Sequence, residues 1–189
     1  MKKIISIMVM LLFSASLMAQ EHLSFKGIPI TGNLSSFCQQ LKNKGFTMLG
    51  KSGNVTVLEG LFTGQKSTVV VTSTDNGEDV FAVAVIFGSD SAWNKLVKTY
   101  DYYKDLYTRK YGTPTISKEE NPSTDNSNTA LMFSLNEGQA VYASLWEVTG
   151  GEIELSIQKA EGSLQGMVVI RYRDKQNVKE KIESDMEEI

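Results

Sequence analysis

The chain has one cysteine, one histidine and three prolines among 189 residues, and the first two shortages exclude whole classes of site. Because Cys38 has no second cysteine to pair with, stability has to come from packing and not from an intrachain disulfide. Cys38 lies at helical spacing from Leu34, Phe37 and Leu41, which favours a small buried apolar side chain over a nucleophile. The single histidine, His22, lies close to the N-terminus, so a catalytic triad or a zinc site built on histidine is disfavoured.

Nucleotide and nucleic-acid binding are disfavoured by two further absences. Neither GxGxxG nor GxxxxGK[ST] occurs, so the glycine-rich loops that hold phosphates are missing. The chain has 19 basic and 22 acidic residues, a net charge of −3, and no basic cluster. This balance argues against nucleic acid and anionic membranes as partners. The sequence therefore predicts no cofactor, no metal and no catalytic residue.

The N-terminus has the layout of a secretory signal peptide. Lys2 and Lys3 precede a mostly apolar run at residues 4–12, and small residues follow up to Ala19. The run is shorter than the roughly 20 apolar residues that a membrane-spanning helix needs. We expect residues 1–19 to be removed by cleavage near Ala19. The mature chain would then be exported, periplasmic or extracellular, with no membrane span.

Two segments have the periodicity of helices. The longer covers residues 91–114, where apolar side chains recur every three or four positions on one stripe: Trp93, Leu96, Val97, Tyr100, Tyr103, Tyr107 and Tyr111. Residues 89–91 supply possible caps for its first turn, and Gly112 ends it. The shorter helix is predicted over residues 34–44, with Asn33 as its cap.

Strand-like runs follow each helix. After the first helix they cover residues 46–49, 55–62, 68–72 and 80–87, and Asn76-Gly77 is typical of a hairpin turn. A two-residue turn there would place Val70 opposite Val83 and Val69 opposite Ala84. Because both faces of this hairpin are apolar, we expect it to be central and covered on both sides.

The second half repeats this order. Its strands are predicted at residues 130–135, 140–148, 153–157 and 167–173, after a polar loop at residues 117–128. The fold predicted is therefore α+β with strands predominating, built from two tandem helix-plus-antiparallel-meander halves. The halves cover residues 20–88 and 89–176, and residues 177–189 form a charged C-terminal tail.

One face of the second meander is a candidate surface for a ligand or partner. Alternation along the strands puts Val141, Ala143 and Leu145 beside Glu152 and Glu154, on the side opposite the core. Such an apolar strip is either covered by another element, the commoner outcome, or binds a partner. A Gly150-Gly151 turn would put Glu147 opposite Glu154, and Tyr102 lies off the core stripe of its helix. The candidate surface is Val141, Ala143, Leu145, Glu147, Glu152, Glu154 and Tyr102.

Carboxylates leave an enzymatic alternative open. Glycoside hydrolysis needs two carboxyl groups roughly 5 to 9.5 Å apart across a sugar. The residues available for such a pair are Glu119, Glu120, Glu147, Glu152 and Glu154. Neighbouring acids on an exposed sheet are more often solvated charges than catalysts.

Several short motifs together point to a family. They are Phe25-x-Gly27-Ile28-Pro29-Ile30-x-Gly32, Lys44-Gly45-Phe46, Leu58-x-Gly60-x-Phe62-x-Gly64, Lys110-Tyr111-Gly112-x-Pro114 and Tyr172-x-Asp174-Lys175-x-Asn177. This set, spread over nearly all of the mature chain, resembles a group of exported proteins from gut Gram-negative bacteria. The resemblance implies export and no particular activity. The tandem order is also similar to the β-lactamase-inhibitor-protein fold, a likeness of topology that implies no function.

The function expected from the sequence is that of an exported, non-catalytic binding or protein-interaction module with an unknown protein or glycan ligand. The alternative is a carboxylate-based hydrolase acting on glycans.

Overall fold

The computed structural model describes residues 21–75, 77–187 and 189, and the predicted leader lies outside them. The strands in this part of the chain are β1 (Ser24–Phe25), β2 (Ile28–Pro29), β3 (Thr47–Ser52), β4 (Val55–Phe62), β5 (Gln65–Ser73), β6 (Val80–Phe87), β7 (Ile116–Glu120), β8 (Val141–Val148), β9 (Gly151–Lys159) and β10 (Gly166–Asp174). The helices are α2 (Leu34–Asn43), α3 (Trp93–Tyr111), α4 (Asn128–Asn136) and α5 (Lys175–Glu187). The protein is an α+β fold in which strands predominate.

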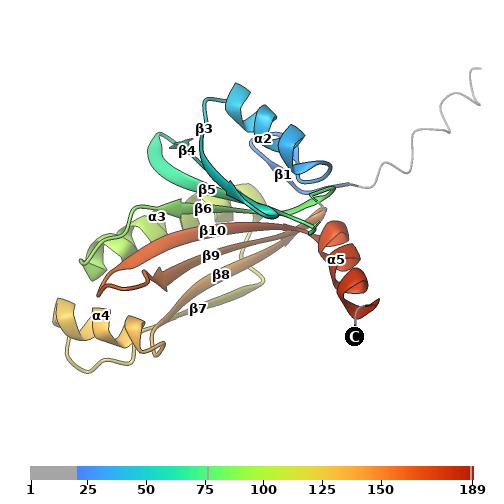
Figure 1. The fold of residues 1–189 in the computed structure, drawn as a ribbon. Coiled ribbons are helices and arrows are strands. Elements are labelled where there is room, and N and C mark those ends of the chain that lie inside the picture. The colour runs from blue at the N-terminus through green and yellow to red at the C-terminus, as the bar shows by residue number, and fades with distance from the viewer. Residues whose placement is uncertain (1–20, 76, 188) are drawn as a thin grey trace, which may run out of the picture.

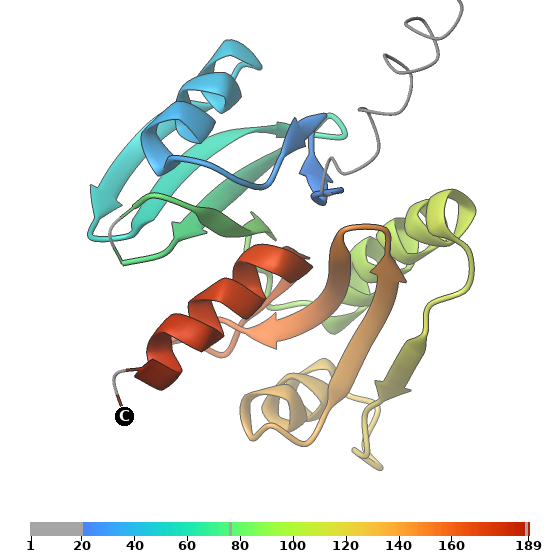
Figure 2. The same ribbon diagram turned by 90° about the vertical axis from the view of Figure 1, so that its right-hand side faces the viewer.

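The two predicted meanders join into one antiparallel sheet of eight strands, in the order β3-β4-β5-β6-β10-β9-β8-β7 (Figure 1). The junction is the pairing of β6 with β10, where Val85 lies opposite Ile170 and Val83 opposite Tyr172. α2 precedes β3 to β6 and α3 precedes β7 to β10, so each half has a helix followed by four sheet strands. Figure 2 brings α5 to the front, at one end of the sheet.

Two predictions in the second half are wrong. Residues 130–135 belong to helix α4, whose N-cap Ser127 accepts a hydrogen bond from the amide of Ala130. A short apolar run is compatible with a helix or a strand, and here Met132 and Leu135 face the core at helical spacing. The first four residues of the polar segment predicted as a loop, 117–120, belong instead to β7, an edge strand that is exposed throughout and pairs with β8 alone. Its backbone pairing, and not an apolar pattern, defines it.

The register of the β5–β6 hairpin also differs from the prediction. Next to the turn, Ser73 lies opposite Val80, as a two-residue turn requires. The register then shifts by one residue, so Val70 lies opposite Ala84 and Val69 opposite Val85. A β-bulge adds an unpaired residue to one strand, which no turn signal in the sequence indicates.

The first turns of α2 and α3 each depend on an asparagine side chain. Asn33 caps α2 by accepting a hydrogen bond from Ser35, as predicted. α3 begins after Ala92, which has no capping side chain, and the amide of Trp93 donates to Asn128 Oδ1 at 2.7 Å. Of the predicted caps at residues 89–91, Asp90 accepts from the amide of Ala92 at 2.8 Å, and the first amide within the helix is capped by a side chain from α4.

One side of the large sheet, the core face, packs against α2, α3 and the β1–β2 hairpin. Its most deeply buried strand side chains are Leu58, Val69, Val71, Val83, Val85, Trp146, Ile153, Leu155, Val168 and Ile170. The predicted stripe of α3 lies against this face, with Trp93, Leu96, Tyr100, Tyr103 and Tyr107 all buried. Each Å² of apolar surface removed from water contributes about 25 cal/mol to the free energy of folding, so this packing is the main stabilising contribution.

The C-terminal segment forms helix α5, and hydrogen bonds anchor the first turn of this helix. The buried Asn177 side chain donates hydrogen bonds to the carbonyls of Ile30 and Val80, at 3.1 and 2.8 Å. Asp174 accepts from the amides of Leu23 and Asn177. These bonds tie the first turn of α5 to the N-terminal hairpin and to β6.

Candidate binding surface and cleft

The side of the sheet opposite the core face, here called the open face, has three rows of side chains that cross the strands. Residues paired across antiparallel strands point to the same side, so the register defines each row. In order from β4 to β8, the rows are Val55, Thr72, Ala82, Arg173, Glu152 and Glu147; Val57, Val70, Ala84, Arg171, Glu154 and Leu145; and Glu59, Thr68, Ile86, Val169, Ser156 and Ala143.

The open face is accessible over most of its width. Apart from Val169 and Ser156, which are buried, and Glu147, which is exposed, its row residues are half-buried. No helix within residues 21–75, 77–187 and 189 packs across the middle of these rows. α5 contacts β6, β9 and β10 at one end of the sheet. The β5–β6 hairpin, predicted to be covered on both sides, therefore has α5 against one end of β6 and, among the described residues, no helix across the middle of its open face.

Two arginines form the charged centre of the open face. Arg173 bonds to Glu152 and, at 2.8 Å, to Glu154. Arg171 contacts Glu154 at 3.5 Å and Gln158 at 3.0 Å. Burial lowers the pKa of Arg173, but its hydrogen bonds to Glu152 and the two nearby carboxylates outweigh this and raise it. The centre is thus an internally paired network with apolar strips on both sides.

The open face includes six of the seven predicted surface residues. Val141, Ala143, Leu145 and Glu147 lie on β8, and the two acids lie beside them on β9: Glu152 and Glu154. Tyr102 is separate, on α3 at the core face, with its ring edge-on to Tyr103.

The predicted pairing of Glu147 with Glu154 is wrong. Val148 pairs with Gly151, so the turn is Thr149-Gly150 and Glu147 faces Glu152. Both glycines explain this register. Gly150 has a φ of +82°, which favours glycine in the turn, and Gly151 approaches the carbonyl of Arg173 too closely for any side chain, so Gly151 belongs to the strand.

Sequence reasoning missed the arginines and the apolar rows of the first half. The signal was present in Arg171-Tyr172-Arg173, where one buried tyrosine between two arginines indicates that both arginines face away from the core. The apolar rows were not identifiable because Val70 and Ala84 resemble core residues until the layers are known.

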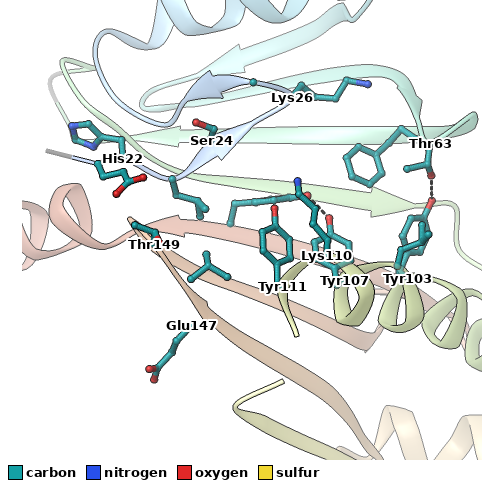
Figure 3. Close-up of a pocket in the computed structure, with 17 residues that line it drawn as sticks. His22, Ser24, Lys26, Thr63, Tyr103, Tyr107, Lys110, Tyr111, Glu147 and Thr149 are labelled. Atoms are coloured by element: carbon teal, nitrogen blue, oxygen red, sulfur yellow. Dashed lines mark hydrogen bonds between the residues drawn. The ribbon is translucent and has the colours of Figure 1, made fainter. Parts of the chain in front are cut away.

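A cleft of about 960 Å³ lies on the other side of the sheet, between α3 and three turns (Figure 3). Two of these turns, Lys26-Gly27 and Thr63-Gly64, have consecutive positive φ values, which a type I′ turn requires. The third turn joins β8 to β9. In the sequence motifs, the glycine two residues after Phe25 and the glycine two residues after Phe62 therefore encode two of the turns that border this cleft.

Tyrosines form the floor of the cleft. The hydroxyls of Tyr107 and Tyr172 bond to each other, and Tyr103 bonds to Thr63 at 2.7 Å. Burial raises the pKa of Tyr103, Tyr107 and Tyr172, so these hydroxyls stay neutral at physiological pH. The floor is neutral and largely apolar.

The carboxylates named for hydrolysis are divided between the two faces. Glu119 pairs with Tyr142 of the core face, whereas Glu120 pairs with Val141 of the open face. Burial raises the pKa of Glu119, but hydrogen bonds from Lys104, Ser117 and Tyr100 outweigh this and lower it. Glu152 and Glu154 are bonded to Arg173. This arrangement gives the hydrolase alternative no support.

Comparisons with protein-family models, curated proteins and solved structures each gave no match. Across the described ranges, no group of three or more His, Cys, Asp or Glu is placed to hold a metal ion. In the same part of the chain, no helix combines the length and apolar character needed to cross a membrane.

Proposed function

We propose that this protein is a non-catalytic binding module that engages a protein partner through the open face. The supporting observation is the breadth of the three rows, which run from β4 to β8 and are at least partly accessible except at Val169 and Ser156. Strands lie about 4.8 Å apart, so these six strands span roughly 24 Å. A standard protein interface covers about 800 Å² on each partner, a patch of roughly this width. The open face is of the right size for a folded partner.

The chemistry of the rows favours a protein over a small molecule or a glycan. Small ligands bind in concave sites that enclose most of their surface. Most of the three rows form a continuous sheet surface, apart from a cavity of about 420 Å³ beside Glu147, Glu152 and Arg173 at one end. Arg171 and Arg173, near the middle of the rows, belong to a residue type that is enriched in protein interfaces.

Affinity capture with variants on both apolar strips tests this proposal. Leu145→Glu alters the strip on β8 and Val70→Glu the strip on β5, and each places a charge where a partner would bury an apolar group. The matched control is Phe133→Glu, at an exposed position of α4 outside the open face. We expect a protein that is captured by the native chain and the control to be lost with both open-face variants. Equal capture by all four proteins would contradict the proposal.

We also propose that the partner lies outside the cytoplasm, because residues 1–19 have the layout of a signal peptide. Expression of the full chain in a Gram-negative host, followed by fractionation and intact-mass measurement, tests export. The expected product starts at Gln20 and is recovered outside the cytoplasm. An uncleaved cytoplasmic chain would contradict it.

A further inference from the structure

The cleft on the core side of the sheet has features that the proposed protein interface does not use. It is bordered by the β1–β2 turn, the β4–β5 turn, the C-terminal half of α3 and the β8–β9 turn. Its volume of about 960 Å³ is at the upper end of the range found for small-molecule sites. Because β1 to β5 belong to the first half and α3, β8 and β9 to the second, both halves of the chain contribute walls.

Two lysines line the cleft on opposite walls, and Figure 3 shows Lys110 pointing into it and Lys26 running along its rim toward Thr63. Lys26 lies in the β1–β2 turn and Lys110 in the last turn of α3 (Figure 3). Lys26 Nζ is 5.6 Å from the ring centre of Phe46 and 5.9 Å from that of Phe62. Lys110 Nζ is 4.7 Å from the ring centre of Tyr111. An ammonium within about 6 Å of an aromatic ring centre is attracted to the ring, which restrains its position.

Neither ammonium has a carboxylate partner. Within the described chain, no Asp or Glu oxygen lies within 4.0 Å of Lys26 Nζ or Lys110 Nζ, whereas Lys66, Lys95 and Lys104 all form ion pairs. The acids that line the cleft are Glu21 and Glu147, and Figure 3 shows Glu147 pointing away from it. Lys26 Nζ donates a long hydrogen bond, 3.5 Å, to the carbonyl of Leu61, and no acid within the described chain neutralises either lysine, so both charges are available to a ligand.

The surface between the lysines is apolar. Leu106 and Tyr111 are half-buried at the cleft wall, and Tyr107 stacks on Tyr111 with ring centres 5.8 Å apart. The hydroxyl of Tyr107 is bonded to Tyr172, so this ring offers its apolar edge and not a free polar group. A ligand that matches these walls has a planar apolar body and an anionic group.

We propose that this cleft binds a small organic anion with a planar apolar body, whose carboxylate or sulfonate lies between Lys26 and Lys110. The ring system packs against Leu106 and Tyr111. Charge complementarity to two ammoniums selects the anion, and the apolar wall selects the body.

Two dyes that differ in one charged group test this proposal. The probes are 8-anilinonaphthalene-1-sulfonate and the uncharged N-phenyl-1-naphthylamine, which have the same ring system. Fluorescence titrations are made with the native protein and with the double variant Lys26→Gln, Lys110→Gln. The control is Lys44→Gln, Lys98→Gln, which changes the net charge equally at exposed positions outside the cleft.

We expect the cleft double variant to weaken binding of the sulfonate dye by about tenfold and to leave the uncharged dye within about twofold. The control should bind both dyes as the native protein does. Two results would overturn the proposal: an unchanged sulfonate affinity in the cleft variant, or an equal loss in the control, which would show a response to net charge alone. Circular dichroism confirms that each variant is folded.

Discussion

Leu145 and Trp146 are neighbours on β8, yet the sheet uses them in opposite ways. Trp146 is 1% exposed, packs 5.5 Å from the ring of Tyr107 on α3 and donates its indole N–H to the carbonyl of Gly112. Leu145 is half-exposed and faces Glu154 on the open face. Most positions of β4, β5, β6, β9 and β10 alternate in the same way, whereas β7 is exposed throughout. The core face therefore carries the buried apolar packing, and the open face carries mostly half-buried apolar and charged groups.

Alkaline pH should affect the core face most strongly. Burial raises the pKa of Tyr100, Tyr103, Tyr107 and Tyr172 above the ordinary value of 10.0. The stability that these four neutral tyrosine hydroxyls contribute is complete at a pH below their ordinary pKa and is lost as the pH rises through their pKa in the folded state. We expect their ionisation, followed by near-ultraviolet absorbance, to coincide with unfolding seen by circular dichroism. Ionisation of all tyrosines near pH 10 in a chain that stays folded would contradict the core-face assignment.

Truncation of the two neighbours on β8 gives the most direct contrast in stability. Trp146→Ala removes a buried indole and should lower the free energy of unfolding by about 3 to 5 kcal/mol. Leu145→Ala, on the open face, should lower it by less than about 1 kcal/mol. Urea denaturation measures both, and losses of similar size would refute the difference between the faces.

Two strand glycines extend this contrast to the first half. A Cβ on Gly60, on the core face, would lie 2.8 Å from Cε1 of Phe46, whereas one on Gly50, opposite Val57, would meet nothing within 4 Å. We expect Gly60→Ala to cost about 1 to 3 kcal/mol through displacement of the Phe46 ring. Gly50→Ala should be neutral or slightly stabilising, because alanine reduces the entropy of the unfolded chain. A destabilised Gly50→Ala variant would indicate that the open face is covered in solution.

The smallest effect is expected in the charged network of the open face. Arg173 and Glu152 are each about a third exposed, so solvent screens their attraction. A double-mutant cycle with Arg173→Gln and Glu152→Gln should give a coupling of about 0.5 to 1 kcal/mol that decreases with added salt. A coupling of several kcal/mol that is independent of salt would mean that this network is a buried part of the core.

The elements with strong local signals were predictable. The stripe of α3, the Asn33 cap and the alternation of β9 each follow from side-chain periodicity. β7 was not predictable, because an exposed edge strand is defined by its partner β8 and not by an apolar pattern. The run from Ala130 to Leu135 is too short to distinguish helix from strand.

The candidate site was predictable only in part. Alternation along β8 and β9 identified Leu145 and Glu154 as facing away from the core. Whether another element covers them depends on the layer arrangement, which a local pattern does not contain. The pairing of β6 with β10, which extends the open face into the first half, joins strands about 85 residues apart and has no local signal either.

The most direct test combines stability and binding in one variant, Val70→Glu with Leu145→Glu. Both substitutions lie on the open face, so we predict a native circular dichroism spectrum, a urea midpoint close to that of the native protein and complete loss of the captured partner. An unfolded variant would show that the open face belongs to the core. A folded variant that still captures the partner would show that binding uses another surface.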